Sequence, residues 1–138
     1  GATFGTPLTG TVPPKCTTNT QTGCLPLYVT LNNGGKECSF VGDTGCTSTR
    51  GLDMSKLKTI QWGCGCNLIL SGGTEWWLHG ANGSTNHQVG GSTIDLSRSA
   101  PNPKLDAYLS GGKPLAPGWY NSPVGLVLFE GNHWHIGT

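Results

Sequence analysis

Six cysteines, all placed before residue 67, constrain this chain of 138 residues more than any other feature. An even number of cysteines at irregular spacing, without a CxxC pair, is typical of a disulfide framework and not of a zinc site or a thioredoxin-type redox motif. The sequence therefore predicts three disulfides. The cysteines are Cys16, Cys24, Cys38, Cys46, Cys64 and Cys66.

Cys64 and Cys66 are separated by one glycine. Two cysteines this close rarely reach disulfide geometry without strain. We expect each of them to bond a different upstream cysteine, which would tie two N-terminal segments to one strand. The complete pairing stays open at this point, because spacing alone does not select among the possible connectivities.

The composition favours a secreted, extracellular protein. Only 11% of the residues are charged, while the chain contains 23 Gly and 9 Pro. The net charge of +1 and the lack of a basic cluster argue against a nucleic-acid partner. No apolar run approaches the roughly 18–20 residues that span a bilayer. We expect a monomer that carries no cofactor and begins, at Gly1, as a mature chain does after removal of a signal peptide.

Asn82 heads the one N-x-S/T sequon without proline, Asn82-Gly83-Ser84. In a secreted eukaryotic protein such a sequon is a glycosylation site on an exposed loop. The sequence predicts that loop over residues 81–91, which are polar and rich in glycine.

Short alternating segments separated by Gly- and Asn-rich turns predict many strands and little helix. The expected strands are 25–31, 36–41, 59–62, 66–70, 75–79, 93–96, 124–130 and 133–136. We expect a hairpin turn at 32–35, a single helical turn near 53–56 and one short helix at 103–109. These elements predict one domain, residues 1–138, folded as a disulfide-stabilised antiparallel β-sandwich or barrel.

The C-terminal hairpin is the most specific local prediction. Gly131-Asn132 is a turn signal between two apolar segments and sets their register. Two residue pairs should face the core and two the opposite side: Phe129–Trp134 and Val127–Ile136, then Glu130–His133 and Leu128–His135.

His133 and His135 would share one face of the last strand, an arrangement that can supply two metal ligands. Glu130, with His79 or His87, could complete such a set. The alternative is that these are polar residues on a solvent-facing hairpin, with Glu130–His133 a minor cross-strand pair. We favour this alternative, so the sequence predicts no metal centre.

Two further enzyme signatures are weak. Asp43-Thr44-Gly45 matches the aspartic-protease tripeptide, but the chain has no second copy, and a simple turn is the better interpretation. Glycoside hydrolysis needs two carboxyl groups flanking the bond. Glu75 with Asp95 or Glu130 is the best pair available, so Glu75 and Glu130 would be the catalytic acids if the chain were a hydrolase.

Five tryptophans in a small protein suggest a binding surface, since an exposed indole stacks on sugar rings or anchors a protein interface. Neighbouring side chains on a strand point to opposite faces, so one residue of a Trp-Trp pair should be core and the other exposed. The alternative is that all five pack in the core. The candidate binding residues are Trp76, Trp77, His79, His87, Trp119 and Tyr120.

A resemblance to a known family rests on the overall properties of the chain and on two short stretches of its sequence. Ala2-Thr3-Phe4 is similar to the opening of thaumatin-like proteins, and Gly42-Asp43-Thr44-Gly45-Cys46 to their Gly-Asp-Cys-Gly stretch. The small, disulfide-held β chain resembles the hypersensitive-response-inducing elicitors secreted by plant-pathogenic fungi such as the rice blast fungus. Thaumatin-like proteins carry at least ten cysteines, and the acidic-cleft residues of their larger members have no counterpart here.

The resemblance implies a non-enzymatic elicitor that a plant cell-surface component recognises, inducing defence responses and cell death. The alternative is a protein that binds cell-wall polysaccharide or hydrolyses it. Exposed loops of a rigid scaffold commonly carry recognition, so residues 75–92 are the expected functional region.

Overall fold

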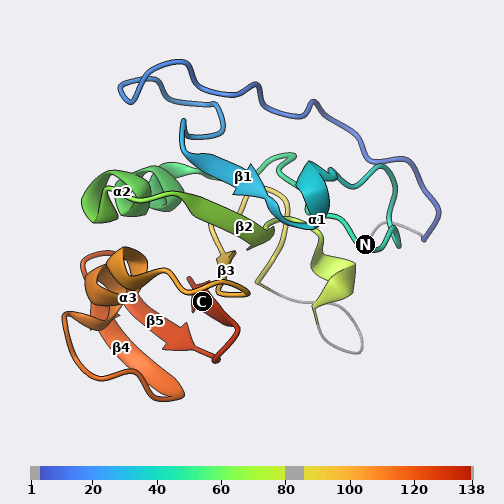
Figure 1. The fold of residues 1–138 in the computed structure, drawn as a ribbon. Helices are drawn as coiled ribbons and strands as arrows, with labels where there is room; N and C mark the ends of the chain where they lie inside the picture. The colour runs from blue at the N-terminus through green and yellow to red at the C-terminus, as the bar shows by residue number, and fades with distance from the viewer. Residues whose placement is uncertain (1–3, 80–85, 138) are drawn as a thin grey trace.

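A computed structural model describes residues 4–79 and 86–137, which form one open, six-stranded sheet with helices against it (Figure 1). The strands are β1 (Val29–Leu31), β2 (Leu68–Gly72), β3 (Ile94–Ser97), β4 (Gly118–Ser122), β5 (Gly125–Phe129) and β6 (His133–Ile136). The helices are α1 (Asn32–Gly35), α2 (Ser55–Cys64), α3 (Pro103–Ser110) and the 3-10 turn η1 (Trp76–Leu78).

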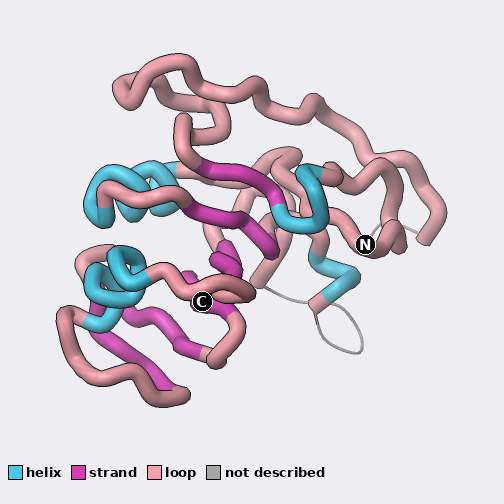
Figure 2. Tube along the Cα trace, in the orientation of Figure 1, coloured by secondary structure: helices cyan, strands magenta, loops and turns pink. Residues whose placement is uncertain are grey.

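The strand order is β1-β2-β3-β6-β5-β4. β1 pairs with β2 in parallel, and every other neighbouring pair is antiparallel. The expected β-rich, disulfide-held character is confirmed. The described residues nevertheless form a single open sheet, where two packed sheets or a closed barrel were expected, and long loops connect its elements (Figure 2).

One face of the sheet carries the main hydrophobic core, because apolar side chains alternate along its strands and meet the buried faces of α2 and α3. Leu57 and Ile60 from α2 and Leu105 and Leu109 from α3 belong to this core. The strands contribute Val29, Leu68, Leu70, Ile94, Leu96, Val127, Phe129, Trp134 and Ile136. We call the opposite side of β3, β4, β5 and β6 the outer face.

The predicted C-terminal hairpin is confirmed, including its register. β5 and β6 pair Val127 with Ile136, Phe129 with Trp134 and Leu128 with His135. The first two pairs are buried, whereas Leu128 and His135 lie half-buried on the outer face. The helix expected at 103–109 is also present, with Asn102 capping its N-terminus by accepting a hydrogen bond from the Leu105 amide.

The strand expected at 59–62 is wrong, because this segment belongs to α2. Its buried residues are Leu57, Ile60 and Gln61, a spacing of three and four that fits one helical face and no strand. A strand would have placed Ile60 and Gln61 on opposite faces. The expected single turn near 53–56 is the start of this ten-residue helix.

Two other expected strands are absent from the described residues. After β1 the chain makes the short helical turn α1, with Asn33 at φ 55°, and 36–41 contributes only isolated bridges in place of a return strand. These bridges join Glu37 to Thr47 and Phe40 to Pro7, so the segment pairs with other loops and not with β1. Residues 75–79 form η1 and its flanks because Glu75 turns inward, as described below.

Three disulfides form, as predicted, but each joins a cysteine to the next cysteine along the chain: Cys16–Cys24, Cys38–Cys46 and Cys64–Cys66. The expectation that Cys64 and Cys66 bond upstream cysteines is wrong. Cys64 ends α2, and Gly65 adopts the left-handed conformation at φ 58°, which turns the chain back and brings Cys66 to a Cα–Cα distance of 5.2 Å from Cys64. Because Gly65 adopts this conformation, Cys64 and Cys66 reach disulfide geometry although only one residue separates them.

None of the helices in the described residues is long and apolar enough to cross a membrane.

The position of α2 in the core leads to a stability prediction. Ile60 is fully buried, so replacing it with alanine removes apolar contacts and should lower the free energy of unfolding by about 2–5 kcal/mol. Thr59, its exposed neighbour on the same helix, is the matched control, and Thr59→Ala should change stability by no more than about 0.5 kcal/mol. Urea unfolding of the oxidised protein measures both, and equal effects would contradict the placement of α2.

Candidate functional site: a histidine–carboxylate cluster

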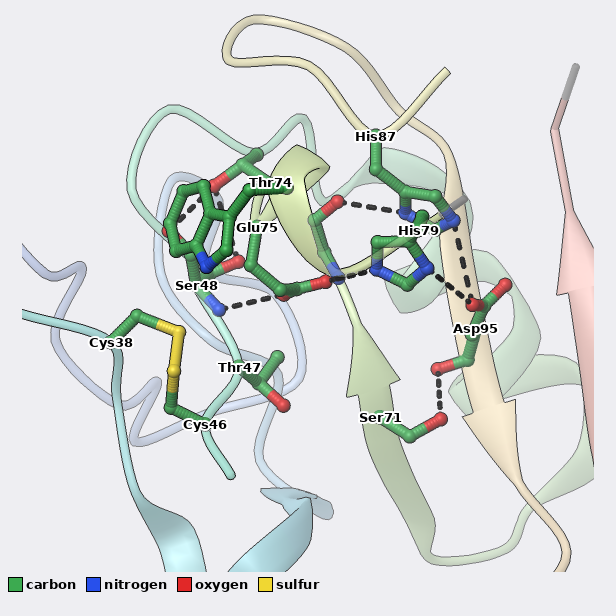
Figure 3. A network of polar contacts seen from close by, with 12 residues as sticks. Cys38, Cys46, Thr47, Ser48, Ser71, Thr74, Glu75, His79, His87 and Asp95 are labelled. Carbon is green, nitrogen blue, oxygen red and sulfur yellow. Dashed lines mark hydrogen bonds and ion pairs between the residues drawn. A yellow bond between two sulfur atoms is a disulfide. The ribbon is translucent and has the colours of Figure 1, made fainter. Parts of the chain in front are cut away.

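Three histidines and two acids from distant parts of the chain meet beside the core sheet. Figure 3 shows two of the histidines, His79 and His87, with both acids. We call this set the His–carboxylate cluster; its members are Glu75, His79, His87, Asp95 and His135. Glu75 follows β2, His79 follows η1, His87 precedes β3, Asp95 lies in β3 and His135 lies in β6. Since adjacent strands bring Asp95 and His135 together directly, the sheet provides the rigid part of the site.

Glu75 is almost fully buried, with 1% of its surface exposed, and its carboxylate is held by backbone amides. The Ser48 amide donates to Oε1 at 2.8 Å, and the Gly73 amide lies 2.9 Å from both oxygens. The turn η1 then places His79 four residues later, with its Nε2 2.5 Å from Glu75 Oε2. This inward turn explains why 75–79 is not a strand.

Asp95 is the centre of the cluster because all three imidazoles approach it. His135 Nδ1 lies 2.9 Å from Oδ1, while His87 Nε2 and His79 Nδ1 approach Oδ2 at 3.4 Å and 3.6 Å. His87 Nδ1 also lies 2.9 Å from the carbonyl oxygen of Gly73. The His79 and His87 rings stack with centroids 3.6 Å apart and planes 14° apart.

A pair of glycines makes room for these contacts. The pairing of β2 with β3 shifts register between Leu70 and Gly72, which brings Gly72 opposite Asp95. A Cβ atom on Gly72 would lie 2.7 Å from Asp95 Oδ2, and one on Gly73 would lie 2.2 Å from the Ser48 carbonyl oxygen. Any side chain at either position would therefore displace the carboxylate of Asp95 or the loop that holds Glu75.

The environment shifts the pKa of two members in opposite directions. Burial by itself raises the pKa of Asp95, but the hydrogen bonds and charges of His135 and His87 outweigh it and hold that pKa well below its usual range. Burial by itself lowers the pKa of His87, but the hydrogen bond and charge of Asp95, with smaller contributions from Gly73 and Glu75, raise it above its ordinary value. Asp95 is therefore ionised at neutral pH.

The structure brings together some of the sequence-derived candidates and separates others. His79, His87, His135, Glu75 and Asp95 meet in the cluster. His133 and Glu130, also considered as ligand and acid, instead form a separate pair at the hairpin turn, with His133 Nε2 3.3 Å from Glu130 Oε1.

The candidate aromatic residues do not form one surface. Trp77 is buried and its indole N–H donates to the Asp43 carbonyl oxygen, and Trp76 packs edge-to-face against Trp77. Tyr120 points to the core side, where its ring packs against Trp134. Trp119 alone among these candidates is largely exposed, at 53%.

Asp43 has a structural role in its turn. Its carboxylate accepts hydrogen bonds from the backbone amides of Ser39 and Thr44 and pairs with Lys36. The Ser39 amide is the main reason that the pKa of Asp43 is lowered. These contacts account for the Asp-Thr-Gly stretch as a turn.

Sequence reasoning did not predict β4, and with it missed the continuation of the outer face. In the observed register Trp119 pairs with Leu128, Leu128 with His135, and His135 with Asp95. These four residues form a cross-strand row that leads from the edge of the sheet to the cluster; we call it the outer row. The alternation of Trp119, Tyr120 and Asn121 at 118–122 was the available signal.

The cluster offers two kinds of chemistry. The Nδ1–H of His135 donates to Asp95, and such a carboxylate contact orients the imidazole in enzymes that use general-base catalysis. Two overlapping sets also place ligand atoms within 4.8 Å of one another and could hold a metal ion: Glu75, His79 and His87, and His87, Asp95 and His135.

The chain matches no family model, no curated protein and no solved structure. The predicted glycosylation site Asn82 lies outside the described residues.

Asp95 provides a prediction about pH. The pKa of Asp95 is lower in the folded than in the unfolded chain, so its ionised carboxylate stabilises the folded state. This stabilisation is fully present above the unfolded pKa of about 3.9 and is lost as the pH falls towards the folded pKa. In a chelating buffer, Asp95→Asn should lower the free energy of unfolding by about 3 kcal/mol at pH 6–7, because buried imidazoles lose their counter-charge. The difference from the unaltered protein should shrink below about pH 4.

Glu130→Gln is the control, since Glu130 is exposed at a turn and should contribute less than about 0.5 kcal/mol at any pH. Urea unfolding between pH 3 and 7 measures both variants. A loss at Asp95 that does not depend on pH would show that the carboxylate charge is not what stabilises the site.

Proposed function

We propose that this is an extracellular protein that binds a neutral polysaccharide along the outer face of its sheet, without cleaving it. The observation that carries the proposal is the outer row, in which an exposed indole leads across three strands to the polar cluster. Adjacent strands lie about 4.8 Å apart, so the distance from Trp119 to His135 is about 10 Å, enough for a short stretch of a sugar polymer.

The chemistry of the outer face favours an uncharged ligand. None of its residues on β4, β5 and β6 is Lys, Arg, Asp or Glu: they are Trp119, Asn121, Leu126, Leu128, His133 and His135. Trp119 and Leu126 are about half exposed, at 53% and 49%. A flat indole suits the C–H face of a pyranose ring, and the Asn121 amide and the cluster supply hydrogen-bonding groups for its hydroxyls.

Binding without hydrolysis agrees with the state of the two acids. Glycoside hydrolysis requires one carboxyl group that is protonated and reaches the glycosidic oxygen. Asp95 is kept ionised by its histidines, and Glu75 is buried with its oxygens engaged by backbone amides. Neither is therefore arranged as the acid of a hydrolase, and Glu130 lies at the hairpin turn.

The proposal predicts that Trp119→Ala weakens binding to an insoluble polysaccharide by at least about tenfold, since truncation of a tryptophan hot spot commonly costs about 2 kcal/mol or more. Co-sedimentation with chitin, cellulose and β-glucan, with the bound fraction measured against polymer concentration, tests this. The same supernatants should contain no reducing sugar above the blank.

Trp62→Ala is the matched control, because Trp62 is also an exposed tryptophan but lies on α2, away from the outer row. It should bind the polymer as the unaltered protein does. The proposal fails if Trp119→Ala retains full binding to the polymer that the unaltered protein prefers, or if the unaltered protein binds none of them.

Recognition by a plant host is the second candidate, and it comes from the resemblance to thaumatin-like elicitors. The observation that favours it is a groove of about 620 Å³ between α2 and the segment pinned by the Cys16–Cys24 disulfide. Trp62 borders this groove and is 68% exposed. An exposed indole beside an apolar groove suits contact with a host cell-surface component.

For this candidate, infiltration of purified protein into leaves should cause cell death and an oxidative burst, and Trp62→Ala should reduce both at equal dose. Trp119→Ala becomes the control and should keep the activity. If Trp62→Ala causes cell death at the same dose as the unaltered protein, the groove is not the recognised surface. If the unaltered protein causes no cell death in any of several hosts, plant recognition is not its function.

A further inference from the structure

We propose that the Cys64–Cys66 disulfide is redox-active and exchanges with the thiol of an uncharged, cysteine-containing peptide that docks beside Cys66. The bridge closes the end of α2, whose buried residues belong to the core, whereas the outer row lies on the other face of the sheet. The proposal therefore goes beyond polysaccharide binding and does not depend on it.

The Cys64–Cys66 bridge differs from the other two disulfides in its exposure. Cys64 and Cys66 are half-buried, and the glycine between them is exposed. The four cysteines of the other two bridges are buried, each with no more than 9% of its surface exposed. Exchange begins when a thiolate reaches a sulfur of the bridge, and exposed disulfides are commonly the labile or catalytic ones. Access therefore favours Cys64–Cys66 as the bridge that reacts.

The same bridge is the one that the fold needs least. Its cysteines are 2 positions apart, whereas those of each other bridge are 8 positions apart. In the chain-entropy account, the stabilisation from a disulfide falls as the closed loop shortens. Hydrogen bonds hold both flanks independently: the Gly65 amide donates to the Gln61 carbonyl oxygen at 3.1 Å, ending α2. After the bridge, the Asn102 side chain donates to the Asn67 carbonyl oxygen at 2.9 Å. The bridge can open while its surroundings stay folded.

A cavity of about 430 Å³ lies beside Cys66 and suits a peptide. Its walls include two exposed aromatic residues, Tyr28 at 50% and Trp62 at 68%. The other residues that line it, none of them charged, are Asn19, Gln61, Gly65 and Asn67. Side-chain amides can donate to and accept from a peptide backbone, and aromatic rings pack on apolar side chains. The cavity thus selects an uncharged peptide and presents its thiol to Cys66.

The position of the two sulfurs determines the direction of attack. Cys66 lines the cavity and Cys64 does not. A peptide thiolate therefore attacks Cys66 Sγ and forms a mixed disulfide, while the electron pair of the broken bridge goes to Cys64 Sγ, which takes a proton from water. The carbonyl oxygens of Gln61 and Cys66 lie 3.8 Å from Cys64 Sγ and can accept from the new S–H.

A second peptide thiolate completes the exchange. It attacks the peptide sulfur of the mixed disulfide, which releases a peptide disulfide and leaves Cys66 as a thiolate that water protonates. The net reaction oxidises two peptide thiols to one disulfide and reduces the bridge to a dithiol. The peptide thiols supply both electrons, so a single turnover needs no other reactant.

The test is a single-turnover reaction of the full oxidised chain with a short, end-blocked, uncharged peptide that carries one cysteine between aromatic residues. The reaction runs without oxygen at about pH 8, where a free thiol is partly ionised. Rapid alkylation and peptide mapping should find the peptide on Cys66 and the alkyl group on Cys64. This bridge should open at least about tenfold faster than the two buried ones. Equally fast opening of either buried bridge, or attachment of the peptide to Cys64, would overturn the proposal.

Tyr28→Ala and Trp62→Ala separate docking in the cavity from simple exposure of the bridge. Each should slow exchange with the peptide by at least about tenfold, the usual effect of truncating an aromatic anchor. Exchange with mercaptoethanol, which is too small to need docking, should keep its rate. Trp119→Ala is the matched control, because Trp119 is also an exposed tryptophan but lies on β4. If both cavity variants react with the peptide as the unaltered protein does, no peptide docks there and the proposal fails.

Replacing both Cys64 and Cys66 with serine should abolish exchange and lower the melting temperature only slightly. Replacing both Cys38 and Cys46 with serine should lower it more, because these cysteines pack in a buried cluster with Val41 and Trp77. A larger loss in the first variant would show that the Cys64–Cys66 bridge is structural. The mapping of the unaltered protein needs neither variant to fold, and a failure of polysaccharide binding leaves it unaffected.

Discussion

Burial of two carboxylates among three imidazoles is the interaction on which the arrangement around the sheet depends. Asp95 reaches the cluster because β2 and β3 shift register where Gly72 leaves space for its carboxylate. Glu75 reaches it because backbone amides replace the water that a carboxyl group loses on burial. These two requirements determine where β2 ends and why the following residues form a 3-10 turn instead of a strand.

The two faces of the sheet carry different kinds of residue. On the inner face, apolar residues of five strands pack against α2 and α3, and this burial supplies most of the cohesion of a chain with long loops. The outer face of β3 to β6 mixes apolar and polar residues, and it joins an exposed indole to the polar cluster. Alternation along each strand makes this separation possible, because neighbouring residues point to opposite faces.

Local signals in the sequence predicted elements whose structure depends on nearby residues. The C-terminal hairpin follows from a two-residue turn and alternation, and the short helix expected at 103–109 is α3. Elements that depend on distant partners were not predictable in this way. Residues 59–62 look like a strand until Leu57, Ile60 and Gln61 are seen to share one helical face. The segment 36–41, expected as a return strand, instead forms isolated bridges with Pro7 and Thr47.

By itself the sequence determined that the cysteines form three disulfides, that β structure dominates and that the last two strands pair as they do, because these features depend on composition and short-range geometry. It also contained every residue of the cluster as a candidate, yet their grouping came from the tertiary structure alone. Glu75, Asp95 and His135 are up to 60 positions apart, and only the β2–β3–β6 order and the register shift bring them together. Long-range strand pairing, which no local pattern encodes, therefore decided the site.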